Sequence, residues 1–159
     1  MNRAALLARL AELGLALPPV AAPVAAYVPA VRSGDQVYTS GQLPFVAGSL
    51  ATVGKVGTGA GLVEPAVAQD LARTAVLNAL AAVLSVVDDD ARLRVVKVVG
   101  FVASAPDFTG QPGVVNGASE LLGELMGDAG VHARSAVGVA VLPLDSPVEI
   151  ELVVEITRS

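Results

Sequence analysis

The sequence contains no cysteine and no tryptophan, and its single histidine is His132. Without cysteine there is no disulfide, no thiolate nucleophile and no cysteine-ligated metal. One histidine excludes a metal site built from several imidazoles, and a Ser-His-Asp triad would have no histidine to spare. Any chemistry must therefore rely on carboxylates, arginines, hydroxyls and backbone groups, or on His132 alone.

Positive charge is also scarce. The only lysines are Lys55 and Lys97, the arginines are scattered, and the formal net charge is −5. Proteins that bind nucleic acid neutralise phosphates with clustered lysine and arginine side chains, and anionic membrane surfaces attract similar clusters. We therefore expect neither a nucleic-acid nor a membrane partner.

Long uninterrupted apolar runs are missing as well. Met1-Asn2-Arg3 followed by alanine and leucine resembles the start of a signal peptide, but Arg9 and Glu12 interrupt the apolar stretch too early. No apolar run approaches the ~18 residues of a membrane span without a charge or a helix breaker. The sequence predicts a short amphipathic N-terminal helix and a cytoplasmic protein.

Small apolar residues are abundant. The chain has 159 residues, the size of one domain, with 53% hydrophobic and 16% charged residues. Most of the hydrophobic residues are alanine and valine, and the aromatic residues are three phenylalanines and two tyrosines. We expect a core packed from small side chains and, because apolar residues far outnumber charged ones, a buried subunit interface.

The spacing of apolar residues predicts an α+β fold, a mixed β-sheet with two long helices packed on one face. The expected elements, in chain order, are a helix at 3–13, an extended linker at 18–23, a β-hairpin at 27–31 and 36–39, an irregular segment at 46–63, a helix from Pro65 to Val87, a strand at 93–103, a helix around 114–125, a strand at 133–142 and an alternating strand at 148–156.

Arg134 is the most informative candidate site residue. On a strand, its face also carries small residues, Ala136, Gly138 and Ala140, which leave room beside the guanidinium for a ligand or a partner's backbone. A guanidinium matches a carboxylate or phosphate in a bidentate way. The alternative is a structural ion pair with Glu149 or another acid.

Four other positions offer weaker signals. Glu149 shares one face of the last strand with Glu151 and Glu155. That face is either simply solvated, or the Glu149 carboxylate lies near an arginine and orients a water molecule. Ser40-Gly41 ends a strand. It forms either an ordinary turn or a place where backbone N–H groups are exposed to an anionic ligand. Asn116, near a helix start, is a cap or a ligand contact. His132 is a structural, exposed or catalytic residue.

Two further segments resemble sites only superficially. Gly57-Thr58-Gly59-Ala60-Gly61 lacks the strand–loop–helix context and the lysine of a phosphate loop. Asp88-Asp89-Asp90 lacks the spacing of an EF-hand loop. We interpret the first as a loop and the second as a solvated helix end.

Several motifs taken in order resemble one known family. They are Tyr38 to Pro44 (YTSGQLP), Val115-Asn116-Gly117, Ala133-Arg134-Ser135, and Leu142-Pro143 followed by Val148 to Glu151 (VEIE). Together they resemble the Rid family, also called YjgF, the reactive-intermediate imine deaminases, over residues 25 to 157. The resemblance implies a chorismate-mutase-like fold and a homotrimer with three clefts between subunits.

The resemblance also implies an activity, the hydrolysis of 2-imino or 2-enamino acids to 2-keto acids and ammonia without a metal or organic cofactor. Arg134 would hold the substrate carboxylate and Glu149 would position the attacking water. The cleft would further be formed by Ser40 and Gly41, which line it, Tyr27, which closes its side, and Asn116, which lies nearby.

The sequence departs from compact members of that family. It adds an N-terminal arm (1–24) before the Rid/YjgF-like domain (25–159) and has a longer loop at 45–63, and either could narrow or cap the cleft. Ala136 replaces a common cysteine and Gly138 a common acid. A non-catalytic binder of small carboxylates, or a regulatory trimer, is therefore the alternative function. A ribonuclease is disfavoured by the acidic charge balance, and chorismate mutation by the few cations near Arg134.

Overall fold

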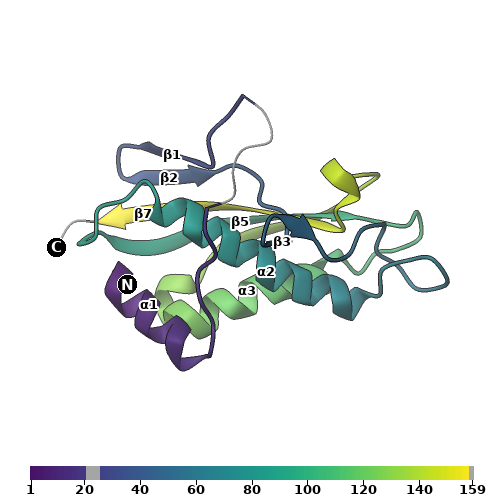
Figure 1. Ribbon diagram of the computed structural model, residues 1–159, viewed down its shortest axis with the longest axis horizontal. Helices are drawn as coiled ribbons and strands as arrows, with labels where there is room; N and C mark the ends of the chain where they lie inside the picture. The colour runs from purple at the N-terminus through teal and green to yellow at the C-terminus, as the bar shows by residue number, and fades with distance from the viewer. Residues whose placement is uncertain (21–25, 158–159) are drawn as a thin grey trace.

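The computed structural model describes residues 1–20 and 26–157, and it has the expected α+β architecture. Helices cover one face of a curved sheet and leave the other face open (Figure 1). The elements are α1 (Arg3–Glu12), β1 (Ala30–Ser33), β2 (Gln36–Thr39), β3 (Phe45–Val46), β4 (Ser49–Leu50), α2 (Pro65–Leu84), β5 (Arg92–Ala103), α3 (Gln111–Met126), the 3-10 turn η1 (Gly127–Gly130), β6 (Ala133–Val139), the 3-10 turn η2 (Pro143–Asp145) and β7 (Val148–Thr157).

The main sheet has the strand order β1-β2-β7-β5-β6. Strands β5 and β6 are parallel and joined through α3, whereas the other neighbours are antiparallel. Val98 on β5 pairs with Arg134 on β6 and with Leu152 on β7, so these three residues share a face. Val98 and Leu152 are buried beneath the helices. Arg134 therefore starts from the helix-covered face of an edge strand.

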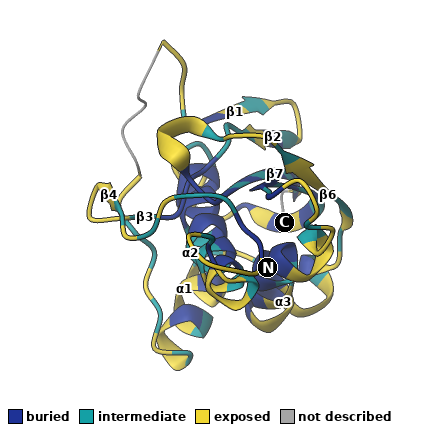
Figure 2. Cartoon of the chain, turned by 90° about the vertical axis from the view of Figure 1, so that its right-hand side faces the viewer, coloured by how far each residue is buried: buried dark blue, intermediate teal, exposed yellow. Residues whose placement is uncertain are grey.

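The core lies between the sheet and helices α2 and α3 (Figure 2). Helix α2 buries Ala68, Ala72, Ala75 and Ala79 completely, and such small side chains let neighbouring backbones come close. At Gly117 on α3, an added Cβ would overlap the carbonyl oxygen of a residue on α2. Small residues at this crossing fix the position of α3, which carries much of the site described below.

The described part of the N-terminal arm belongs to this core. Helix α1 is capped by Asn2, whose side chain accepts a hydrogen bond from the Ala5 amide (2.9 Å), and it buries Leu6 and Leu10. Arg9 Nε donates to the carbonyl of Glu124 near the end of α3 (3.0 Å). The arm helix thus packs against the C-terminal end of α3.

The structure corrects several expected boundaries. The segment 46–63 is not wholly irregular, because β3 and β4 form a hairpin at its start and Val56 bridges to Ser104. Helix α2 ends at Leu84 rather than at Val87. The apolar pattern continues past its end because Val86 and Val87 still pack on the core outside the helix. Strand β1 begins at Ala30 rather than residue 27, and β6 ends at Val139 rather than residue 142.

Helix α2 carries Asp70 and Arg73, so it is consistent with the expectation that no apolar run of membrane-spanning length lacks a charge or a helix breaker. By length and composition alone it could cross a membrane. It is the central helix of the core, however, and most of its residues are buried against α3 and the sheet. The linker expected at 18–23 lies partly outside the described residues.

Candidate functional site

The guanidinium of Arg134 is held by helix α3. Its Nη1 donates to Asn116 Oδ1 (2.8 Å) and Ser119 Oγ (3.1 Å), and its Nη2 donates to the carbonyl of Pro112 (3.3 Å). All three acceptors are neutral. Among residues 1–20 and 26–157, no ion pair involves Arg134. The structural ion pair with Glu149 considered for Arg134 is therefore absent, and the acceptors orient the guanidinium while leaving its charge uncompensated.

His132 supports this arrangement through Ser119. Its Nε2 lies 3.0 Å from Ser119 Oγ, and its Nδ1 contacts the Gly130 carbonyl. Because a carbonyl only accepts, Nδ1 carries a proton. In the neutral imidazole Nε2 then accepts a hydrogen bond from the Ser119 hydroxyl, which turns the oxygen lone pairs of Ser119 toward Arg134. His132 is thus a positioning residue, one hydrogen bond removed from the guanidinium.

A second group of candidates lies around Glu149 on β7. Gln42 and Ile150 exchange backbone hydrogen bonds of 2.9 and 3.0 Å, and this bridge sets Gly41 beside β7. The Glu149 carboxylate fills the space that a Cβ at Gly41 would occupy. The hydroxyl of Ser40 donates to the Val28 carbonyl (2.6 Å), which ties this turn to the segment just after Tyr27.

Within one chain the two groups do not meet. Val98 and Phe101 on β5 pair with Arg134 and Val137 on β6, and Phe101 also pairs with Glu149. Positions three residues apart on a strand point to opposite faces. Arg134 therefore lies on the helix-covered face and Glu149 on the open face. A site that uses both requires two chains.

Tyr27 has a less defined place. Its side chain is largely exposed, and its neighbour Val28 accepts the bond from Ser40. It therefore belongs with the Glu149 group.

The acidic triplet Asp88-Asp89-Asp90 takes part in surface ion pairs, Asp88 with Arg32 (3.3 Å) and Asp89 with Arg3 (2.5 Å). No group of three metal-ligating side chains occurs among the residues that the structure describes.

The electrostatics of Glu149 suit proton transfer. Burial raises the pKa of its carboxyl above the ordinary value, and the neighbouring Glu151 carboxylate raises that pKa further. Burial also raises the pKa of Glu151. A carboxyl whose pKa moves toward neutrality is a better general acid–base than an ordinary glutamate.

The raised pKa makes Glu149 a cost to stability at neutral pH. A folded-state pKa above the unfolded value means that stability is lost as pH rises through the folded pKa. We expect Glu149→Gln to raise the melting temperature at pH 7. The gain should shrink as pH falls toward ~4, near the ordinary pKa of glutamate. Melting curves across this range measure the effect. Glu120→Gln, at an exposed position of α3, is the control. A change in melting temperature from Glu149→Gln that is the same at pH 7 and at pH ~4 would contradict the prediction.

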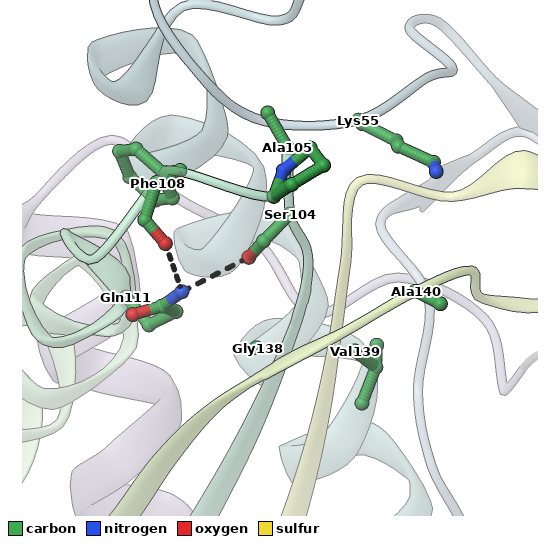
Figure 3. Close-up of a pocket in the computed structure, with 9 residues that line it drawn as sticks. Lys55, Ser104, Ala105, Phe108, Gln111, Gly138, Val139 and Ala140 are labelled. Carbon is green, nitrogen blue, oxygen red and sulfur yellow. Dashed lines mark hydrogen bonds between the residues drawn. The ribbon is translucent and has the colours of Figure 1, made fainter.

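A pocket of about 400 Å³ opens near the N-terminal end of α3, the end at which the Pro112 carbonyl accepts from Arg134 (Figure 3). It contains polar side chains from three segments, Lys55 from the long loop, Ser104 after β5 and Gln111 at the start of α3. The amide of Gln111 donates to Ser104 Oγ (3.1 Å) and to the Phe108 carbonyl (2.7 Å). The loop at 45–63 thus contributes to this pocket, whereas α1 packs at the other end of α3.

Sequence reasoning missed Ser119, Gln111 and Lys55. Ser119 lies one helical turn after Asn116, a spacing that places both on one side of α3 and was a usable signal. Gln111 and Lys55 gave no local signal, because they meet the site only through the tertiary fold.

Comparisons with known proteins agree with this architecture. Residues 7–156 match the family described as "YjgF/chorismate_mutase-like, putative endoribonuclease". Protein TCP17 of Trypanosoma cruzi is 41% identical over 152 residues, covering 95% of this chain and 94% of that protein. The crystal structure of Atu1372 from Agrobacterium tumefaciens is 45% identical, with a TM-score of 0.84 over 97% of this chain and 94% of that one.

A more distant structure shares the fold over most of its length. The YjgF gene product of E. coli is 26% identical, with a TM-score of 0.60 over 87% of this chain and 98% of that chain. The family match includes the Arg134, Asn116, Gly41 and Glu149 positions and extends into α1. The resemblance seen in the sequence is confirmed, and the chain belongs to the Rid/YjgF family, whose fold is chorismate-mutase-like.

Proposed function

We propose that the protein hydrolyses 2-imino and 2-enamino acids to 2-keto acids and ammonia, in clefts between the subunits of a cytoplasmic homotrimer. The observation that carries this proposal is the state of Arg134. Its guanidinium is fixed by three neutral acceptors on α3 and has no carboxylate partner among the described residues. Such a cation is preorganised for the carboxylate that every 2-imino acid carries.

The trimer supplies the second half of the cleft. Arg134 and Asn116 come from one subunit, and Glu149, Gly41, Ser40 and Tyr27 from its neighbour. The open face of the sheet supports such an assembly, because Val31, Tyr38 and Val137 expose large apolar surfaces there. Large apolar side chains exposed on a sheet face are typical of a protein–protein interface.

The chemistry requires only these groups. Arg134 holds the carboxylate and fixes the imine carbon, which is already electrophilic. Glu149 accepts a proton from water as the hydroxyl adds to that carbon, and returns it to the imine nitrogen to give a carbinolamine. Glu149 then moves the hydroxyl proton of the carbinolamine to the same nitrogen, so that ammonia leaves while the C=O bond forms. Fixing the substrate and delivering one water provides the orientation part of the rate enhancement, and no metal or organic cofactor takes part.

The test couples the purified protein to a threonine dehydratase and traps the imine with semicarbazide. Wild type is expected to speed release of the keto acid. Arg134→Ala should lower this acceleration about 100-fold or more, because two charge-assisted hydrogen bonds to the carboxylate are lost. Arg134→Lys should recover only part, since an ammonium cannot form the bidentate pair. Arg92→Ala, an exposed arginine at the start of β5, is the matched control.

The same assay separates the alternatives. Keto acids that bind in an Arg134-dependent way, without any acceleration of hydrolysis, would establish the non-catalytic carboxylate binder or regulatory trimer instead. A third possible function is RNA cleavage, because the family is described as a "putative endoribonuclease". The net charge of −5 disfavours it, and RNA cleavage that survives Arg134→Ala would overturn our proposal.

A further inference from the structure

The pocket beside Gly138 continues the Arg134 site. Gly138 and Arg134 lie on the same face of β6, separated only by Ala136 on that face. Pro112, whose carbonyl accepts from Arg134, directly follows Gln111, which lines the pocket. Helix α3 rises about 1.5 Å per residue, so the Arg134 contacts at Pro112 and Asn116 lie within about 8 Å of Gln111 along the helix axis. A chain attached to a carboxylate on Arg134 can therefore enter this pocket.

The pocket stays open because residue 138 is glycine. A Cβ at this position would lie 2.7 Å from Gln111 Nε2 and 3.1 Å from Ser104 Oγ, so any side chain would press on the amide. The remaining wall is apolar, with Ala105, Pro106 and Phe108. These surfaces suit a short aliphatic chain.

Lys55 supplies the only charge in the pocket lining, and its backbone is firmly placed. The adjacent Val56 is fully buried, donates to the Ala103 carbonyl (2.7 Å) and accepts from the Ala105 amide (2.8 Å). Among the described parts of the chain, every ion pair uses an arginine as its cation. The ammonium of Lys55 is therefore available for a ligand, on the far side of the pocket from Gln111 (Figure 3).

We propose that this pocket binds the distal carboxylate of the substrate, and that the preferred substrates are 2-imino dicarboxylates, with the corresponding 2-keto dicarboxylates as products. Arg134 binds the carboxylate next to the imine, the apolar wall contacts the methylene chain and Lys55 pairs with the second carboxylate. This inference rests on the proposed function for the reaction, but binding of the keto acids tests it independently of catalysis.

The experiment measures binding of 2-ketoglutarate and 2-ketoadipate by calorimetry, with 2-ketohexanoate as an uncharged chain of similar length. Wild type should bind a dicarboxylate more tightly than 2-ketohexanoate. Lys55→Met keeps the aliphatic stem but removes the charge, and should weaken dicarboxylate binding about tenfold, while 2-ketohexanoate binds as before. Lys55→Arg should retain the preference. Arg92→Ala makes the same change in net charge away from the pocket.

The possible failures are distinguishable. If keto acids bind and imines are hydrolysed, but Lys55→Met weakens both classes equally or neither, the dicarboxylate proposal is overturned and the proposed function stands. If none of the keto acids binds wild type but imines are hydrolysed, the dicarboxylate proposal is overturned and the proposed function stands. If keto acids neither bind nor are released faster from imines, both proposals are overturned. Charge-dependent binding without hydrolysis would support the pocket and favour the non-catalytic binder.

Discussion

Arg134→Ala and Glu149→Gln are expected to be inactive separately and active together. Their side chains lie on opposite faces of one sheet, so a site that uses both takes one from each of two subunits. Random trimers of the two variants would pair an intact Arg134 with an intact Glu149 at about one site in four. Refolding equal amounts together should therefore recover about a quarter of wild-type deaminase activity, from variants that each lose about 100-fold.

The imine-trapping assay measures this recovery, and the mass of the assembly in solution accompanies it. Each variant refolded alone is the control, because refolding itself must restore nothing. Mixed trimers that stay as inactive as the single variants would show that both residues act within one chain or that they do not share a site. A monomeric mass for the wild type would remove the inter-subunit cleft altogether.

Gly41→Ala is expected to reduce activity nearly as much as loss of Glu149 does. The added methyl would overlap the Glu149 carboxylate, which must then leave its place against the Gly41 backbone. Because Gly41 does not have a positive φ, alanine is tolerated by the backbone itself. The overlap should also lower the free energy of unfolding by about 1–3 kcal/mol.

A double-mutant cycle shows whether the effect passes through Glu149. If it does, Gly41→Ala combined with Glu149→Gln should lose little more activity than Glu149→Gln alone, because the two changes disable one group. Gly113→Ala is the control, since a Cβ at this helical position meets nothing within 4 Å. Fully multiplicative losses in the double variant would refute a shared mechanism.

The sequence predicted the elements of the fold well and the site in part. Apolar periodicity marked α2, α3, β5 and β7 because each buries one face against a common core. The hairpin β3–β4 was missed because a two-residue strand has too little periodicity to detect. Helix α2 was extended too far, because apolar residues beyond its end still pack on the core.

Two features of this protein were determined by the sequence alone. The absence of cysteine and the single histidine limited the chemistry to arginine, carboxylates, hydroxyls and backbone groups, or to His132 alone. Arg134 was identified because its neighbours on the strand are small, and the ordered motifs around it indicated the family. These are properties of residue type and local order, which a sequence states directly.

Only the tertiary structure decided how these residues combine. Strand register set Arg134 and Glu149 on opposite faces, a result that depends on pairing between segments far apart in the chain. Helix packing brought Ser119 to the guanidinium and His132 to Ser119, and a bridge at Val56 placed Lys55 in the pocket by Gly138. Local sequence cannot encode such contacts by itself, because the free energy that fixes them comes from burial of the whole core.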